Sequence, residues 1–162
     1  MNPAWISFFE AAAGASAALT GLIFVALSVN IARILEYWHL PARAAAAMGA
    51  LMLILVSSLA TLAPQPIRLM GAETLAFTAV VWWLQLDSAR QSLAAARAAT
   101  RPWHEFTIEF TMGEVQMIPY AVGGALLALG SGDGFYWLAA GAALVFVLAV
   151  VNAWVLLVEI LR

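Results

Sequence analysis

The sequence contains no cysteine and no lysine, and charged residues of every kind are scarce. Without cysteine the chain cannot form a disulfide, a thiolate metal site, an iron–sulfur centre or a thiol nucleophile. Charged residues make up 10% of the 162 positions, whereas soluble domains average about 25%. A formal net charge of −2 offers no basic surface for nucleic acid. These absences exclude much redox chemistry and make a nucleic-acid partner unexpected.

What the chain has instead is apolar residues, which make up 65% of it and give a mean hydropathy of +0.95. Such a chain is too apolar for a soluble domain of this length. No arginine precedes the first apolar segment, and a run of small residues at 11–17 comes before most of it. We therefore expect this segment to be a retained membrane helix, not a cleaved signal peptide.

Five stretches approach the length of about 20 apolar residues that a membrane-spanning helix needs. We predict helices at about 4–31, 43–63, 67–86 with a polar continuation to about 100, 107–130 and 134–161. Asn2 and Pro3 favour a helix start, and Pro119 should kink the fourth helix and free a backbone carbonyl. The predicted fold class is all-α, a single membrane domain built as a bundle of five transmembrane helices.

Arginine positions predict the orientation, because cytoplasmic loops of membrane proteins carry an excess of Lys and Arg. With five spans, one side of the membrane holds six of the seven arginines, namely Arg33, Arg43, Arg90, Arg97, Arg101 and Arg162. The other side holds only Arg68. We therefore predict an N-terminus outside and a C-terminus inside. If helices 43–63 and 67–86 formed one re-entrant hairpin, the number of spans would fall and Arg162 would change sides.

Small residues recur in stripes along three of the predicted helices, and such stripes let helix backbones approach closely in lipid. The residues are Ala11, Gly14, Ala18, Gly21, Val25 and Ser28 on the first helix, Gly124 and Ala128 on the fourth, and Ala139 and Ala143 on the fifth. The ordinary interpretation is packing of the five helices within one subunit. A homo-oligomeric interface, or a pore lined by the first stripe, is the alternative.

Residues 8–30, FFEAAAGASAALTGLIFVALSVN, resemble the first helix of a set of small, largely uncharacterised bacterial inner-membrane proteins. The resemblance covers 23 of the 162 residues. It implies a bacterial origin and a multi-pass location in the inner membrane. It implies no activity, cofactor or catalytic residue.

Acidic and amide residues in the predicted spans are the candidate functional residues, because ionisable groups are costly in a membrane. The candidates are Glu10, Glu73, Glu114, Gln116, Asn152 and Glu159. In the predicted orientation, carboxylates flank both ends of the bundle, an arrangement that suits a path for cations or protons. The competing interpretation is structural. Three of the glutamates lie in early helical turns, where the helix dipole stabilises a carboxylate, and the amides would bond neighbouring helices.

Other chemistry has little support in the sequence. His39 and His104 both lie outside the predicted spans, which disfavours haem inside the bundle, and no pair of metal ligands has a motif spacing. Trp82 and Trp83 fit an aromatic belt at the membrane surface. No nucleotide-binding, zinc-protease or nucleophile-elbow motif occurs. We therefore expect no enzyme activity, no cofactor and no metal.

Two classes of function fit these patterns. The first is a homo-oligomeric channel or transport protein for cations or protons, with Glu10 and Glu73 at the outer mouth and Glu114 toward the inner one. The second is a non-enzymatic accessory or assembly subunit that docks on another membrane protein, or a protein that binds lipid or another hydrophobic ligand between its helices. In each case the lipid bilayer is a partner.

Overall fold

The structure is a computed structural model of the chain, and it describes residues 2–36, 40–98, 111 and 113–161. Throughout this part of the chain the regular elements are α-helices, as predicted. They are α1 (Pro3–Val29), α2 (Ile31–Glu36), α3 (Leu40–Leu62), α4 (Ile67–Ala98), α6 (Met117–Ala128) and α7 (Gly134–Leu161). Backbone alone is described at residues 33, 95, 96, 98 and 152–161.

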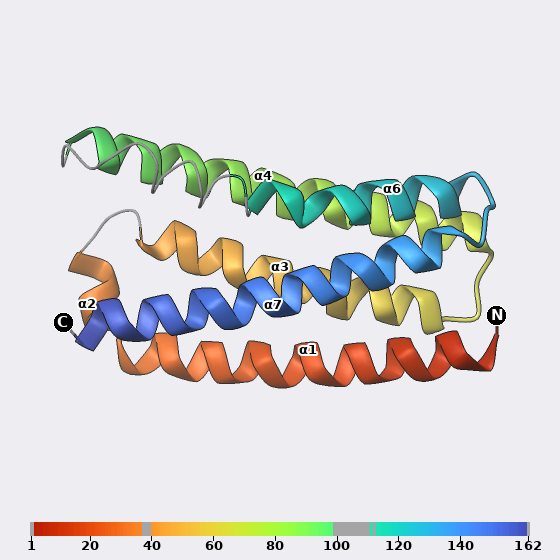
Figure 1. Cartoon of the computed structure of the whole chain (residues 1–162), viewed down its shortest axis with the longest axis horizontal. Helices are drawn as coiled ribbons and strands as arrows, with labels where there is room; N and C mark the ends of the chain where they lie inside the picture. The colour runs from red at the N-terminus through yellow and green to blue at the C-terminus, as the bar shows by residue number, and fades with distance from the viewer. Residues whose placement is uncertain (1, 37–39, 99–110, 112, 162) are drawn as a thin grey trace.

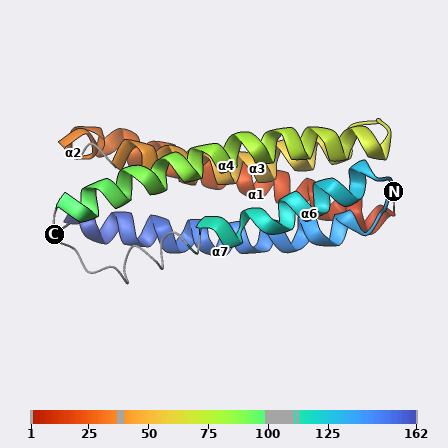
Figure 2. The same cartoon turned by 90° about the horizontal axis from the view of Figure 1, so that it is seen from above.

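The helices form an elongated bundle in which the chain reverses at the two ends (Figure 1). One end, the amino end, holds the N-terminus, the turn between α3 and α4, and the turn between α6 and α7. The carboxyl end holds α2 and the last turns of α4 and α7. α3 packs against α1, α4 and α7, while α6 packs against α4 and α7. Figure 2 shows α1 crossing the bundle obliquely, close to α7 at the amino end and closer to α3 farther along.

Four helices are long and apolar enough to cross a membrane, namely α1, α3, α4 over 67–94 and α7 over 134–151. The fourth predicted span, 107–130, is described at residues 111 and 113–130, and its regular helix α6 covers Met117–Ala128. The count of five spans and the orientation therefore stay predictions.

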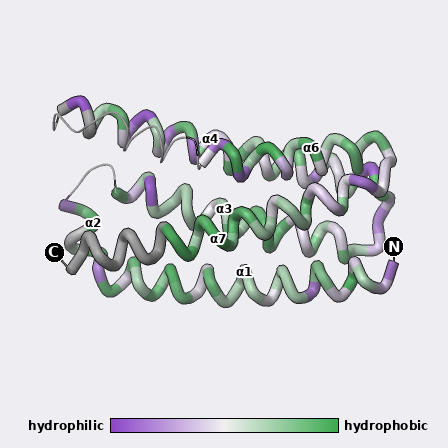
Figure 3. Tube along the Cα trace, viewed as in Figure 1, coloured by the Kyte–Doolittle hydropathy of each residue, from purple (hydrophilic) through white to green (hydrophobic). Residues whose placement is uncertain are grey.

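α4 is longer than a membrane requires. Its 32 residues extend about 48 Å at 1.5 Å per residue, against a hydrocarbon core of about 30 Å. Its hydrophilic residues gather toward the carboxyl end (Figure 3). The predicted polar continuation to about residue 100 is thus helical up to Ala98.

The ends of α1 follow local rules. The Asn2 side chain accepts a hydrogen bond from the Ala4 backbone N–H at 3.0 Å, and Pro3 occupies the first helical position. Asn30 then ends the helix, with its backbone N–H donating to the carbonyls of Ala26 and Leu27. The chain continues as the short helix α2, which the sequence did not predict as a separate element.

The fourth predicted helix is interrupted close to Pro119. Residues 113–115 are helical, Gln116 forms a turn, and α6 begins at Met117. Proline has no N–H to donate to the carbonyl of the residue four positions earlier, which here is Val115. The interruption therefore lies where the sequence predicted a distortion.

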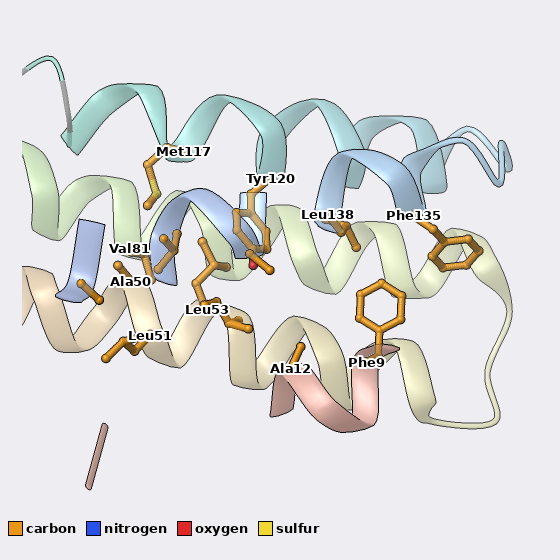
Figure 4. Packing of buried hydrophobic residues seen from close by; sticks show 14 of the residues in the cluster. Phe9, Ala12, Ala50, Leu51, Leu53, Val81, Met117, Tyr120, Phe135 and Leu138 are labelled. Atoms are coloured by element: carbon orange, nitrogen blue, oxygen red, sulfur yellow. The ribbon is translucent and has the colours of Figure 1, made fainter. Parts of the chain in front are cut away.

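Apolar side chains fill the middle of the bundle (Figure 4). The most deeply buried of them are Phe9 of α1, Leu51, Leu53 and Ile54 of α3, Val81 of α4, Met117, Tyr120 and Leu127 of α6, and Leu138 and Val145 of α7. The outer surface is also apolar, with Leu22 at 67% and Val29 at 78% exposure on α1. An apolar exterior around a packed core is what a helix bundle in lipid requires.

Glycines bring α4, α6 and α7 into close contact. A Cβ atom at Gly71 of α4 would lie 2.1 Å from the backbone nitrogen of Ala128 and 2.7 Å from the carbonyl oxygen of Gly124. A Cβ atom at Gly134 of α7 would likewise lie 2.5 Å from the carbonyl oxygen of Gly123. Of the predicted packing residues, Gly124 and Ala128 therefore lie in a helix contact within the subunit.

The small-residue stripe of α1 has a different place. Its members Ala11, Gly14, Ala18, Gly21, Val25 and Ser28 are all exposed, and nothing lies within 4 Å of a Cβ built at Gly14 or Gly21. α1 instead packs through the opposite face, which carries Phe9, Ala12 and Ser16. The interpretation that this stripe packs the helices of one subunit is wrong for α1, because the side of α1 that carries the stripe faces away from the bundle. On α7, Ala139 is half-buried and Ala143 is exposed.

Candidate functional site

The candidate site is a contact between α4 and the helical residues just before α6. The indole Nε1 of Trp82 donates a hydrogen bond to the Glu114 carboxylate oxygen Oε2 at 2.7 Å. Both side chains are half-buried. Trp82 and Trp83 were both expected in an aromatic belt, and in the structure Trp83 is exposed, at 61%, whereas Trp82 is half-buried. The close contacts of Gly71 with Gly124 and Ala128, toward the amino end, hold α4 and α6 side by side. Trp82 and Glu114 meet along the same pair of segments.

The position of this hydrogen bond along α4 gives its depth. Trp82 comes 15 residues after Ile67, which is about 22 Å along the helix axis. The apolar stretch of α4 ends near Leu86, about one helical turn farther on. If that stretch lies in the membrane, Glu114 is inside the apolar layer near its edge at the carboxyl end. A carboxylate at that depth is costly and needs a polar partner, which Trp82 supplies.

Gln85 extends the polar contact toward α3. Its Nε2 donates to the Ala46 carbonyl oxygen, at a long 3.4 Å, and its Oε1 lies 3.4 Å from a Cβ built at Gly113. One turn farther along α4, Ser88 is buried. Polar atoms of three chain segments thus gather near the carboxyl end of the bundle.

Gln116 lies on another side of the same helix. It is two residues after Glu114, a spacing that does not place two side chains on one helix face. It shares its face with Tyr120, four residues later, and only 5% of it is exposed. No hydrogen bond joins its side chain to any residue in the described part of the chain. A buried carboxamide without a partner is unusual and costly.

Tyr120 carries the polar face into the middle of the bundle, where its ring points between α3 and α7 (Figure 4). It is 1% exposed, and its hydroxyl forms a side-chain hydrogen bond with Ser57. The Ser57 hydroxyl donates to the Leu53 carbonyl oxygen at 2.6 Å, so the tyrosine is the donor of the pair. Only a glycine fits beside the ring, because a Cβ at Gly141 would lie 2.8 Å from two ring carbons.

Several other buried hydroxyls bond within their own helices. Ser16 donates to the Ala13 carbonyl, Thr61 to the Ser57 carbonyl and Thr78 to the Thr74 carbonyl, at 2.7 to 3.0 Å. Such bonds satisfy the donors locally. These side chains add neutral polarity to the interior without linking one helix to the next.

The other predicted candidates lie apart from Glu114. Glu10 is exposed on α1. Glu73 is exposed at the amino end and accepts a hydrogen bond from Gln65 Nε2, which also donates to the Ala60 carbonyl, both at 2.8 Å. Glu73 therefore stabilises the turn between α3 and α4. The backbones of Asn152 and Glu159 belong to α7, but their side chains lie outside the described part.

No metal-binding group of three His, Asp or Glu side chains occurs among the described residues. His39 and His104 both lie outside that part of the chain. Sequence patterns had singled out Glu114, but not the Trp82 indole as its partner. Only a contact across helices reveals such partners.

Protein-family models, curated proteins and solved structures were compared with the chain, and none matched. What the chain does is therefore inferred from its own residues.

Proposed function

We propose that this is a non-enzymatic, five-span protein of the bacterial inner membrane, with its N-terminus outside, that takes up protons or small cations at Glu114 from the cytoplasmic side. The observation that carries the proposal is the Glu114 carboxylate itself. It is half-buried at the depth of an apolar helix and is held by one neutral donor, Trp82. Intramembrane carboxylates commonly mark pathways for ions or protons.

The local chemistry supports reversible charging of Glu114. Trp82 donates to Oε2, and in the described part of the chain no hydrogen bond reaches Oε1. An indole N–H has no charge, so it orients the carboxylate without neutralising it. The carboxylate therefore keeps one oxygen that can accept a proton or contact a cation.

An open pore along the axis of one subunit does not fit this core. Leu53, Tyr120 and Leu138 fill the middle of the bundle, each 1% exposed or less. Transfer along hydrogen-bonded groups requires no such opening, so protons suit the geometry better than hydrated cations. The outer mouth expected at Glu10 and Glu73 is not part of this proposal, because both residues are exposed and far along the bundle from Glu114.

Proton flux in liposomes tests the proposal. Purified protein should acidify vesicles that enclose a pH-sensitive dye, and Glu114→Gln should reduce the flux to the level of empty vesicles. Glu10→Gln and Glu73→Gln are the matched controls, and both should keep the wild-type flux. Flux no greater than in empty vesicles, or wild-type flux in Glu114→Gln, would refute the proposed function.

A second candidate function is assembly through α1, favoured by the exposed small-residue stripe described above. Only 11% of the apolar window of α1 is buried, against 44% for α3, so the helix has a large free face. A second copy of this chain is the occupant we consider, because one stripe of small residues can pack against its own copy around a twofold axis.

The natural absence of cysteine makes this assembly testable by disulfide crosslinking in membranes. Ala18→Cys should crosslink to a dimer, while Leu22→Cys, exposed but beside the stripe, should not. Monomer alone in Ala18→Cys and Gly21→Cys membranes would argue against a second copy at this face.

A further inference from the structure

We propose that the Gln116 carboxamide binds a water molecule inside the bundle, on the helix face that also carries Tyr120, the hydrogen-bonded partner of Ser57. The water site stands on geometry alone. Its role as a proton link rests on the proposed function.

The first support is the unpaired amide. Gln116 is 5% exposed, and its side chain has no hydrogen-bond partner in the described part of the chain. A carboxamide has two N–H donors and one carbonyl acceptor, and leaving them unpaired in an apolar interior costs free energy. The structure should offset that cost with a small hydrogen-bonding partner.

The second support is the helix interruption at the same place. Pro119 cannot donate to the carbonyl of Val115, the residue directly before Gln116. In membrane helices, ordered water commonly satisfies a carbonyl that proline frees. The Gln116 amide and the Val115 carbonyl are thus neighbouring polar groups, and a buried water typically makes two to four hydrogen bonds.

The surroundings select water over an ion. Gly141 of α7 packs beside Tyr120, and the two helices run in opposite directions, so Gln116 lies near the level of Val145. Val145 and Met117 are completely buried and apolar. The Glu114 carboxylate points to a different side of the helix, so a cation beside Gln116 would lack a counter-charge.

The position also suits a link. Gln116 and Tyr120 share one helix face and lie about 6 Å apart along the axis, at 1.5 Å per residue. The Tyr120 hydroxyl then reaches Ser57 on α3. Water at Gln116 would extend the polar face of the buried hydroxyl pair by about one helical turn toward the carboxyl end.

Water-edited solid-state NMR in lipid bilayers tests the site directly. The chain has four glutamines, so side-chain ¹⁵N labelling gives few signals, and Gln116→Met identifies the one that belongs to Gln116. Magnetisation from water should reach the Gln116 amide as fast as it reaches Gln91 at the polar part of α4. Transfer no faster than to the side chains of the dry core would overturn the water site.

Flux measurements separate the link from the site. Gln116→Met should lose proton flux, while the neighbouring apolar change Met117→Leu should keep it, with both variants folded by circular dichroism. Normal flux in Gln116→Met, with the wild-type water signal present, would overturn the link and leave the water site standing. Absence of flux in the wild type would refute the proposed function, but the NMR result would still decide the site.

Discussion

At the scale of single residues, the missing side chains of glycine matter most where two helix backbones touch. Gly71 faces the backbone of Ala128, whereas Gly14 on α1 has open space above its Cα. The same residue type is therefore indispensable at one position and replaceable at the other. Only the contact with a neighbouring helix distinguishes Gly71 from Gly14.

Gly71→Ala should destabilise the protein, because its methyl group would overlap the α6 backbone and force the two helices apart. Overpacking of this kind costs about 1 to 3 kcal/mol. Gly14→Ala is the control and should change the unfolding free energy by about 0.5 kcal/mol or less. Denaturation in detergent micelles, followed by tryptophan fluorescence, measures both. Equal stabilities of the two variants would contradict the close contact.

The pair of Tyr120 and Ser57 makes a second prediction at this scale. Tyr120→Phe removes a donor and should cost about 0.5 to 1.5 kcal/mol, while Ser57→Ala leaves a buried hydroxyl unpaired and should cost about 1 to 3 kcal/mol. In the double variant the two costs should not add, because the same bond is lost only once. Tyr136→Phe, at an exposed tyrosine, is the control. Additive costs would show that the hydroxyls do not interact.

At the scale of elements, α1 packs along α3 and also meets α7 at the amino end. An aromatic cluster at the amino end joins it to α7, with the ring centroids of Trp5 and Tyr136 4.8 Å apart and those of Phe9 and Phe135 6.0 Å apart. Farther along, α1 presents mostly exposed residues. The aromatic cluster therefore adds a contact with α7 to the packing of α1 on α3.

Phe9→Ala should weaken the attachment of α1, since truncating a buried phenylalanine costs about 3 to 5 kcal/mol. Phe24→Ala, at an exposed position of the same helix, should cost far less. Limited proteolysis in mild detergent should cleave after α1 faster in Phe9→Ala than in either the wild type or Phe24→Ala. A cleavage rate of Phe9→Ala equal to that of the wild type would show that Phe9 does not help to attach α1.

At the scale of the whole molecule, charge is distributed unevenly between the two ends. Arg90 and Arg97 lie on the polar part of α4 toward the carboxyl end, and Arg43 begins α3 there, whereas Arg68 lies at the amino end. The excess of arginine predicts that the carboxyl end faces the cytoplasm.

Reporter fusions check this orientation. A fluorescent protein fused after Arg162 should fold and fluoresce, because its fluorescence needs the cytoplasm, while alkaline phosphatase at the same position should stay inactive. The phosphatase should become active when fused in the turn between α6 and α7. Active phosphatase at the C-terminus would reverse the orientation or change the number of spans.

The sequence by itself determined the helical class, the apolar character and most helix limits. The reason is that length, apolar runs and proline or glycine punctuation act locally. Thus the predicted helix 67 to about 100 is α4, Ile67–Ala98, and the predicted helix 134–161 is α7, Gly134–Leu161. The distortion near Pro119 also follows from one residue's chemistry. Glu114 and Gln116 stood out because polar groups are costly in apolar segments.

Only the tertiary structure decided which face of each helix turns inward and which side chains meet. A stripe of small residues has the same spacing whether it packs inside or faces out, so the exposed position of the α1 stripe was not readable from the pattern. The bond from Trp82 to Glu114 joins residues 32 positions apart, and Tyr120 reaches Ser57 from a different helix. Such contacts depend on how whole helices pack, and helix packing is a property of the assembled bundle.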